Sequence, residues 1–96
     1  MTTYNGHDFE RACVERIVRT IEDNPNSWNH TKFARVVFGE GESGVTTWRT
    51  VRKGGRRFSV AELIDGLSAL LIKPASFFFE IQEIIATKPT EKKNVA

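Results

Sequence analysis

Apolar residues recur every three or four positions along most of the chain, a period that is typical of amphipathic α-helices rather than of strands. Residues 8–23, DFERACVERIVRTIED, carry one such stripe, and Asp8 stands where it can cap the helix. Asn24-Pro25-Asn26 then ends it. Cys13 lies on the apolar stripe, so we expect it to be a small core residue.

A second helix is predicted from about His30 to Phe38. Asn29, immediately before it, is a good N-cap residue. Trp28 precedes the cap and Phe33 occupies the fourth helical position, which matches the pattern of a hydrophobic staple. We therefore expect these two rings to pack together where the helix begins.

The segment 45–53, VTTWRTVRK, predicts a short third helix. Val45, Trp48 and Val51 are three positions apart and form a narrow apolar seam. Gly54-Gly55 follows and supplies the backbone freedom for a left-handed cap. The Thr, Arg and Lys residues between the seam positions are therefore expected on the outer faces of this helix.

A fourth helix is predicted over residues 60–72, because Ser59 and Glu62 form the Ser-x-x-Glu pattern of a capping box. Its apolar residues predict a buried stripe: Val60, Leu63, Ile64, Leu67, Leu70 and Leu71. Lys73-Pro74 breaks the chain, since proline suits the first turn of a new helix. A fifth helix is predicted over residues 75–86, ASFFFEIQEIIA.

Five helices in 96 residues with 40% apolar content predict an all-α fold with a single core. We expect an N-terminal arm over residues 1–7 and the folded domain over residues 8–86. Residues 87–96, TKPTEKKNVA, are polar and aperiodic, and we expect them to form a disordered tail.

A glycine-rich stretch, GEGESG at residues 39–44, joins the second and third predicted helices. Its spacing is that of the G-x-G-x-x-G loop that wraps a dinucleotide pyrophosphate between a strand and a helix. Here Val36-Val37-Phe38 is predicted to end a helix, and the carboxylates of Glu40 and Glu42 would repel a pyrophosphate. We therefore interpret residues 38–44 as an extended turn and expect no cofactor.

Positive charge is concentrated in one window of the sequence. The net charge is only +2, but residues 44–57 contain five cations and no acid: Arg49, Arg52, Lys53, Arg56 and Arg57. A concentrated positive field in a near-neutral protein indicates an anionic partner, and nucleic acid is the first candidate. RNA is the weaker option, since no aromatic platform for single strands accompanies these cations.

Two short helices around a turn, the second ending in basic residues, resemble the helix-turn-helix of the Cro and phage-repressor type, the Xre family. The similarity covers residues 28–79, a little over half of the chain. NHTKFA at 29–34 resembles the T-Q-x-E-L-A opening of the first motif helix, and TWRTVRKG at 47–54 resembles the T-I-S-x-I-E-x-G end of the recognition helix. The most specific block is RR at 56–57 with SVAELI and ALLI, which resembles R-x-P-S-L-x-T-L-x-x-L-A-x-A-L-G-V.

This resemblance implies a lambda-repressor-like fold and a sequence-specific double-stranded DNA-binding transcriptional regulator, either a repressor or Cro-like. It implies base contacts in the major groove for five residues of the third helix: Val45, Thr46, Thr47, Arg49 and Thr50. It implies contacts with backbone phosphates for five others: His30, Arg52, Lys53, Arg56 and Arg57. The expected setting is the cytoplasm, for a prokaryotic or phage-encoded protein associated with the nucleoid.

Two of the departures from the family pattern concern the packing of the helices. Between Ala34 and Trp48 the chain has about four surplus residues. We assign them to the turn, with Ser43 or Gly44 expected to cap the third helix. Gly66 stands where the family has a larger apolar residue, so we expect a neighbouring side chain to pack closely against it.

Three adjacent aromatic residues, Phe77-Phe78-Phe79, span too wide an arc of one helix for a single buried stripe. We expect at least one of them, with Phe79 the first candidate, to be exposed in a monomer. A homodimer on a palindromic operator is the simplest account, because the family commonly dimerises through its C-terminal end. The interface candidates are Phe77, Phe78, Phe79 and Ile81. The alternative is that the fifth helix folds back over Phe9 and Val14 of the same chain.

Other classes of function lack a signature in the sequence. His7 and His30 stand far apart without Cys or acid partners at ligand spacing, so we expect no metal site. No base accompanies Cys13, so we expect no enzyme activity and assign no catalytic residue. No apolar run approaches the roughly 20 residues of a membrane-spanning helix, so no membrane contact is expected. A protein-interaction module, such as an antitoxin or anti-repressor with the same fold, stays open as the alternative.

Overall fold

The structure, a computed structural model, describes the backbone of residues 6–95 and the side chains of residues 6–86. This part of the chain contains five helices and no strands: α1 Gly6–Asp23, α2 His30–Phe38, α3 Glu42–Arg52, α4 Val60–Ala69 and α5 Pro74–Val95. The predicted all-α class is therefore confirmed. No helix in the described part has both the length and the hydropathy that crossing a bilayer requires.

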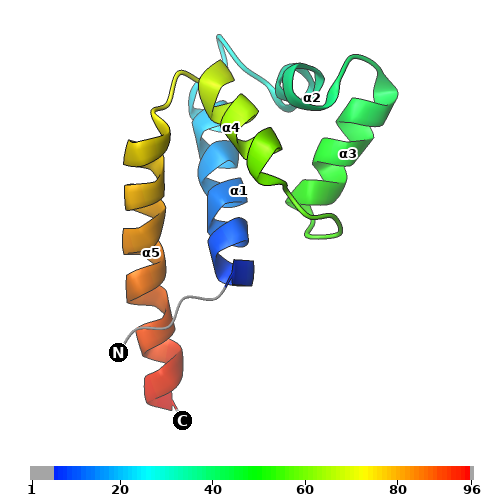
Figure 1. Cartoon of the computed structure of the whole chain (residues 1–96). Coiled ribbons are helices and arrows are strands. Elements are labelled where there is room, and N and C mark those ends of the chain that lie inside the picture. The colour runs from blue at the N-terminus through cyan, green and yellow to red at the C-terminus, as the bar shows by residue number, and fades with distance from the viewer. Residues whose placement is uncertain (1–5, 96) are drawn as a thin grey trace.

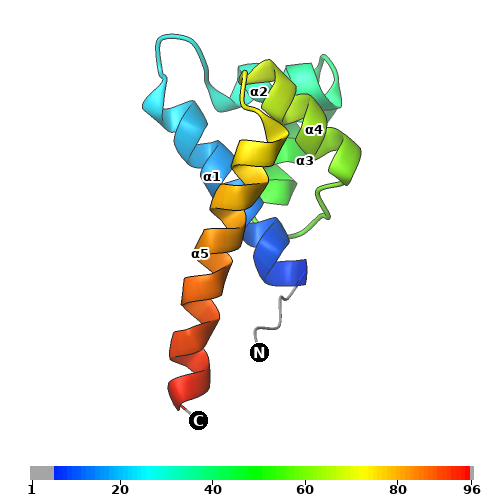
Figure 2. The same ribbon diagram turned by 60° about the vertical axis from the view of Figure 1, so that its left-hand side comes forward.

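The helices form two groups (Figure 1). α1 and α5 lie side by side and antiparallel, while α2 and α3 form a second pair joined by a short turn. α4 lies between the two groups and packs on α2 (Figure 2). Because α1 also contacts α2 and α3, it holds the second pair in place.

Three local signals at helix ends are confirmed. The Asn29 side chain caps α2 by accepting a hydrogen bond from a backbone N–H of the first turn. The rings of Trp28 and Phe33 meet edge to face with centroids 6.3 Å apart, as expected of a staple. Ser59 and Glu62 exchange both hydrogen bonds of the capping box that starts α4.

The helix limits differ from the domain limits predicted from the sequence. α1 begins at Gly6, so Asp8 lies in the first turn of the helix and does not cap it. A carboxylate in the first turn still stabilises the helix, because it lies near the positive end of the helix dipole. Residues 1–5 of the predicted arm lie outside the described residues. α5 continues past residue 86, and the side chains beyond that point lie outside the described residues, so disorder over 87–96 stays a prediction.

Aromatic rings from α2, α3 and the segment before α4 form one half of the core. Trp48 is completely buried. Its ring centroid lies 4.8, 6.1 and 5.7 Å from those of Phe33, Phe38 and Phe58, respectively. Tilted and offset rings at such separations add to the stabilisation that apolar burial provides. The other half is the α1–α5 contact, and its buried residues include Cys13, Val14, Ile17, Ile21, Phe77, Ile81 and Ile85.

Phe58 is a core residue that the periodic patterns do not single out, because it lies in the connection between two helices. The sequence nevertheless contains a signal for it. Phe58 precedes the cap Ser59, and Leu63 occupies the fourth helical position, which is the staple pattern already seen with Trp28 and Phe33. Both Phe58 and Leu63 are buried.

The buried stripe of α4 is narrower than predicted. Leu63 and Leu67 are buried, but Val60 is 72% exposed and Ile64 is 36% exposed. α4 therefore has one packed side and one open side, and residues four apart on the open side face solvent. Leu71 is 91% exposed, since it lies past the end of the helix with a φ of 61°.

The connection between α2 and α3 is short, so the prediction of an extended turn over residues 38–44 is wrong. α2 ends at Phe38 and α3 begins at Glu42, which leaves three connecting residues. Gly39 and Gly41 have φ of 106° and 107°, a region that side-chain-bearing residues rarely adopt, and they reverse the chain sharply. The surplus residues instead extend α3 at its start, and Gly41 takes the N-cap position without a side-chain bond.

Two glycines allow backbones and rings to approach closely. A Cβ at Gly44 would lie 2.3 Å from the carbonyl oxygen of Gly39, so the first turn of α3 rests directly on the glycine turn. A Cβ at Gly66 would lie 2.8 Å from Cζ of Phe33. The close approach expected at Gly66 is therefore confirmed.

Gly44→Ala is expected to lower the free energy of unfolding by about 1–3 kcal/mol, because the added methyl would overlap backbone atoms of the turn. The direction of this change distinguishes the close approach from an ordinary helix position, since Gly→Ala inside a helix ordinarily raises the free energy of unfolding by up to about 1 kcal/mol. Urea denaturation measures the change. Gly6→Ala is the control, because nothing lies within 4 Å of a Cβ at that position. A Gly44→Ala protein as stable as the parent would contradict the close approach.

Candidate nucleic-acid interface

The side of α3 that faces away from the core carries a row of polar and charged side chains. Glu42, Thr46, Arg49 and Lys53 are separated by four, three and four positions, so they lie along one side of the helix. All four are exposed. We call them the outer row of α3. The opposite side carries the apolar seam, which is buried as predicted at Trp48 and at Val51.

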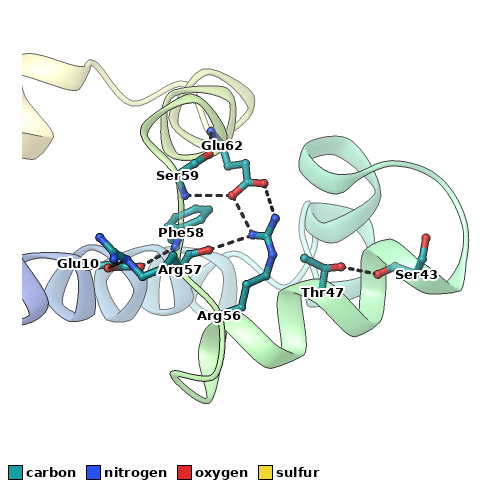
Figure 3. A network of polar contacts seen from close by, with 8 residues as sticks. All are labelled: Glu10, Ser43, Thr47, Arg56, Arg57, Phe58, Ser59 and Glu62. Carbon is teal, nitrogen blue, oxygen red and sulfur yellow. Dashed lines mark hydrogen bonds and ion pairs between the residues drawn. The ribbon is translucent and has the colours of Figure 1, made fainter.

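The residues predicted to contact bases do not all lie in the outer row. Thr46 and Arg49 do, whereas Val45 belongs to the apolar seam and is half-buried. Thr47 and Thr50 are also half-buried, and their hydroxyls donate hydrogen bonds to backbone carbonyls one turn earlier (Figure 3 shows Thr47). A threonine hydroxyl that donates within its own helix still offers its methyl group and an acceptor lone pair to a ligand.

Each of the two arginines that follow α3 is paired with a carboxylate (Figure 3). Arg56 donates from two nitrogens to both oxygens of Glu62, each at 3.0 Å. This hydrogen bonding lowers the pKa of Glu62 and raises the pKa of Arg56. Nε of Arg57 lies 3.2 Å from Glu10, whose other carboxylate oxygen accepts from the backbone N–H of Phe58. The charges of both arginines are therefore partly neutralised within the chain.

His30 is predicted to contact a phosphate, but both of its ring nitrogens have partners in the chain. Nδ1 accepts a hydrogen bond from the Nε1–H of Trp48 at 3.1 Å, and Nε2 lies 3.1 Å from the carboxylate of Glu22. This pairing requires the tautomer that carries its hydrogen on Nε2. The geometry thus favours a structural role for His30, because it satisfies the N–H of a buried indole.

Arg52 also turns away from the outer row. Its guanidinium carbon lies 5.8 Å from the ring centroid of Trp48, and its backbone carbonyl accepts a hydrogen bond from Arg11. Burial, followed by the charge of nearby Arg49, lowers the pKa of Arg52. These contacts favour cation–π packing over the predicted phosphate contact.

Arg49 and Lys53 keep exposed cations to which no carboxylate in the described part of the chain is paired. A hollow of about 360 Å³ opens beside Lys53, between α1 and the loop that follows α3. Its lining includes Lys53, Arg11, Arg56 and Arg57 together with the carboxylate of Glu10. The surface around the end of α3 therefore brings four cations together, with one carboxylate among them.

Two of the four residues predicted for a dimer interface are in the monomer core. Phe77 and Ile81 are buried, so the prediction that they contact a second chain is corrected. Phe78 is half-buried and stacks on Phe9 with centroids 5.9 Å apart, which agrees with the alternative that α5 folds back over α1. Phe79 is 65% exposed, as expected.

Metal binding and thiol chemistry depend on the surroundings of the His, Cys, Asp and Glu side chains. The residues that the structure describes include no group of three or more His, Cys, Asp or Glu side chains arranged to hold a metal ion. Cys13 is a core residue, as predicted. Burial and then the charge of Glu10 raise the pKa of its thiol to about 12, which disfavours the reactive thiolate at neutral pH.

Comparisons with protein-family models, with curated proteins and with solved structures find no match to this chain.

The Arg56–Glu62 pair predicts how stability changes with pH. Folding lowers the pKa of Glu62. The ionised Glu62 carboxylate therefore stabilises the folded state at pH values above its pKa in the unfolded chain, and this stabilisation is lost as the pH falls through its pKa in the folded chain. Glu62→Gln keeps an amide for the capping box but removes the charge. Between about pH 5 and pH 3, we expect the free energy of unfolding to fall less in Glu62→Gln than in the parent. The difference between the two decreases is expected to be less than about 1 kcal/mol, because the pair is partly exposed. Urea titrations across this range measure it, and equal slopes would contradict the prediction.

The hydrogen bond between Trp48 and His30 predicts a cost for removing its acceptor. His30→Phe leaves a buried indole N–H unpaired and is expected to destabilise the fold by about 1–3 kcal/mol. The same substitution in a Trp48→Phe background should cost less, because no indole N–H remains. A double-mutant cycle measured by chemical denaturation tests this, and additive effects of the two substitutions would exclude the coupling.

Proposed function

We propose that this chain is a sequence-specific double-stranded DNA-binding transcriptional regulator, a repressor or Cro-like protein with a lambda-repressor-like fold. In this proposal α2 and α3 form its helix-turn-helix, and α3 lies in the major groove. The observation that carries the proposal is the outer row of α3, where Arg49 and Lys53 are exposed and pair with no carboxylate of the described residues, while the opposite side of the helix is buried.

The outer row has the chemistry that base recognition requires. The guanidinium of Arg49 can donate two hydrogen bonds to the O6 and N7 acceptors of guanine. Thr46, one turn earlier, can contact a base with its hydroxyl or its methyl group. α3 is held rigidly by the burial of Trp48 and Val51, so these side chains approach a groove from a fixed backbone.

Phosphate contacts are proposed for the cations around the hollow beyond α3. Lys53 has no carboxylate partner among the described residues, and the side chain of Arg57 is 90% exposed despite its bond to Glu10. Arg56 is the weaker candidate, because Glu62 engages two of its nitrogens. Three or four such contacts correspond to a slope of log affinity against log salt of roughly −3 to −4.

We further propose a homodimer on a palindromic operator, with Phe79 of α5 at the interface. Its exposed ring is the part of the predicted interface that the monomer does not cover. Two copies would present two α3 helices to half-sites about 34 Å apart. A prokaryotic or phage-encoded protein of the cytoplasm is the proposed setting.

A protein-interaction role, such as that of an antitoxin or anti-repressor, is the second candidate. The observation that favours it is the set of large apolar side chains exposed away from α3: Val36, Val60, Ile64 and Leu71. These side chains are apolar, whereas the outer row is polar and charged. Substitutions in the outer row are therefore expected to weaken DNA binding if the first candidate is correct, and to leave partner binding unchanged if the second is correct.

Selection of bound sites from a random duplex pool tests the proposed function, with a palindromic consensus as the expected result. Arg49→Ala is expected to relax the preference at one base pair, with a loss of about 1–3 kcal/mol of binding free energy on the preferred site.

Lys53→Ala is expected to weaken binding to all duplexes alike and to reduce the slope of log affinity against log salt by about 1. Lys73→Ala is the control, because this exposed cation lies in the α4–α5 connection, away from α3 (Figure 1).

Absence of duplex binding at low salt would overturn the DNA-binding proposal and leave the interaction module as the candidate. If all three variants weakened binding alike and left the consensus unchanged, recognition by α3 would be excluded.

A further inference from the structure

Glu42 is the acidic member of the outer row of α3. It is the first residue of α3, it is exposed, and within the described part of the chain its carboxylate takes part in no hydrogen bond or ion pair. Its position results from the short glycine turn. Because the surplus residues extend α3, Glu42 lies on a helix in line with Thr46 and Arg49 instead of in a flexible loop.

Glu40, two positions earlier, differs from Glu42 in just this respect. It lies in the turn, and it lines a hollow on the α2 side together with Asn29, Lys32 and Arg35. Its carboxylate is therefore beside cations of α2 and is not part of the outer row. Glu40 provides a matched control of equal charge and similar exposure.

The spacing of the outer row relates Glu42 to a specific base pair. Glu42 and Arg49 are seven positions apart, and at about 1.5 Å per residue this separation is roughly 10.5 Å along the helix. Base pairs are stacked about 3.4 Å apart along the DNA axis, and the major groove is inclined to that axis, so this distance along the groove corresponds to roughly two to three steps. A base pair about two to three steps from the one that Arg49 contacts would therefore lie level with Glu42.

A carboxylate discriminates among bases because it only accepts hydrogen bonds at neutral pH. In the major groove, guanine presents acceptors to it and thymine presents an acceptor and a methyl group. Adenine presents an N6 amino donor beside the N7 acceptor, which repels a carboxylate, whereas the N4 amino group of cytosine is a donor with no acceptor on the same base beside it. Near backbone phosphates the same charge is repelled. A hydrogen-bond donor on a base edge is thus the feature of DNA that offsets the electrostatic cost of bringing the Glu42 carboxylate into the groove.

We propose that Glu42 is a specificity-determining residue that accepts a hydrogen bond from a cytosine N4 amino group, about two to three base pairs from the guanine bound by Arg49. This inference rests on the proposed DNA-binding function. It goes further in stating which base the start of α3 selects, and it makes the extra turn of α3 part of the recognition surface.

Two substitutions separate this role from a general effect of charge. Glu42→Ala removes the acceptor, and the preference for cytosine at one base pair is expected to fall by about 5- to 100-fold. Glu42→Gln supplies an amide that can bind adenine through its N6 and N7 atoms, so the selected base is expected to shift toward adenine. Both variants should also bind non-cognate duplexes more tightly than the parent, because a negative charge is lost near phosphates.

The measurement is site selection from a random duplex pool, followed by competition binding at one fixed salt concentration for the parent, Glu42→Ala, Glu42→Gln and Glu40→Gln. Glu40→Gln is expected to keep the parental consensus. Circular dichroism and the unfolding midpoint of each protein establish that α3 is intact, so a change of consensus is not a consequence of unfolding.

An unchanged consensus in both Glu42 variants, with a uniform gain in affinity, would overturn the role of Glu42 and leave the proposed function standing. A parent protein that binds no duplex at low salt would overturn both proposals. The two failures are distinguishable, because the first requires specific binding by the parent and the second excludes it.

Discussion

The burial of Trp48 is the constraint on which the rest of the structure depends. Its ring packs against Phe33 and Phe38 of α2 and against Phe58 before α4, so one side chain joins three segments of the chain. A buried indole N–H must have an acceptor, and His30 provides it from the first residue of α2. Because this contact fixes how α3 rotates about its own axis, it also decides which side chains of α3 form the outer row.

The glycine turn adds a second constraint on α3. Gly39 and Gly41 adopt backbone conformations that other residues rarely adopt, and Gly44 allows the helix to rest on the turn without a side chain between them. A chain with more residues between two helices ordinarily has room for a longer loop. Here the close approach at Gly44 leaves the surplus residues in the helix, so the exposed surface of α3 gains a turn that begins with Glu42.

The distribution of charge changes between the sequence and the folded chain. Five cations in one window indicate an anionic partner, but folding pairs three of the groups predicted to contact phosphate with carboxylates from outside that window. Glu62 engages Arg56, Glu10 engages Arg57 and Glu22 engages His30. These pairs hold the side chains in defined positions and reduce the net positive field. The cations left exposed and unpaired in the described part of this window, Arg49 and Lys53, are both in the outer row.

The sequence by itself determined the helices and most of their ends, because caps, staples and capping boxes are made by residues within about four positions of one another. It also determined that Trp48 and Val51 face inward and that Phe79 is exposed, since helical period fixes which residues share a face. Only the tertiary structure decided that α4 has an open side, that Arg52 packs on Trp48 and that Phe77 belongs to the monomer core. These outcomes depend on which helix lies opposite each face, and that information comes from packing between residues far apart in the chain.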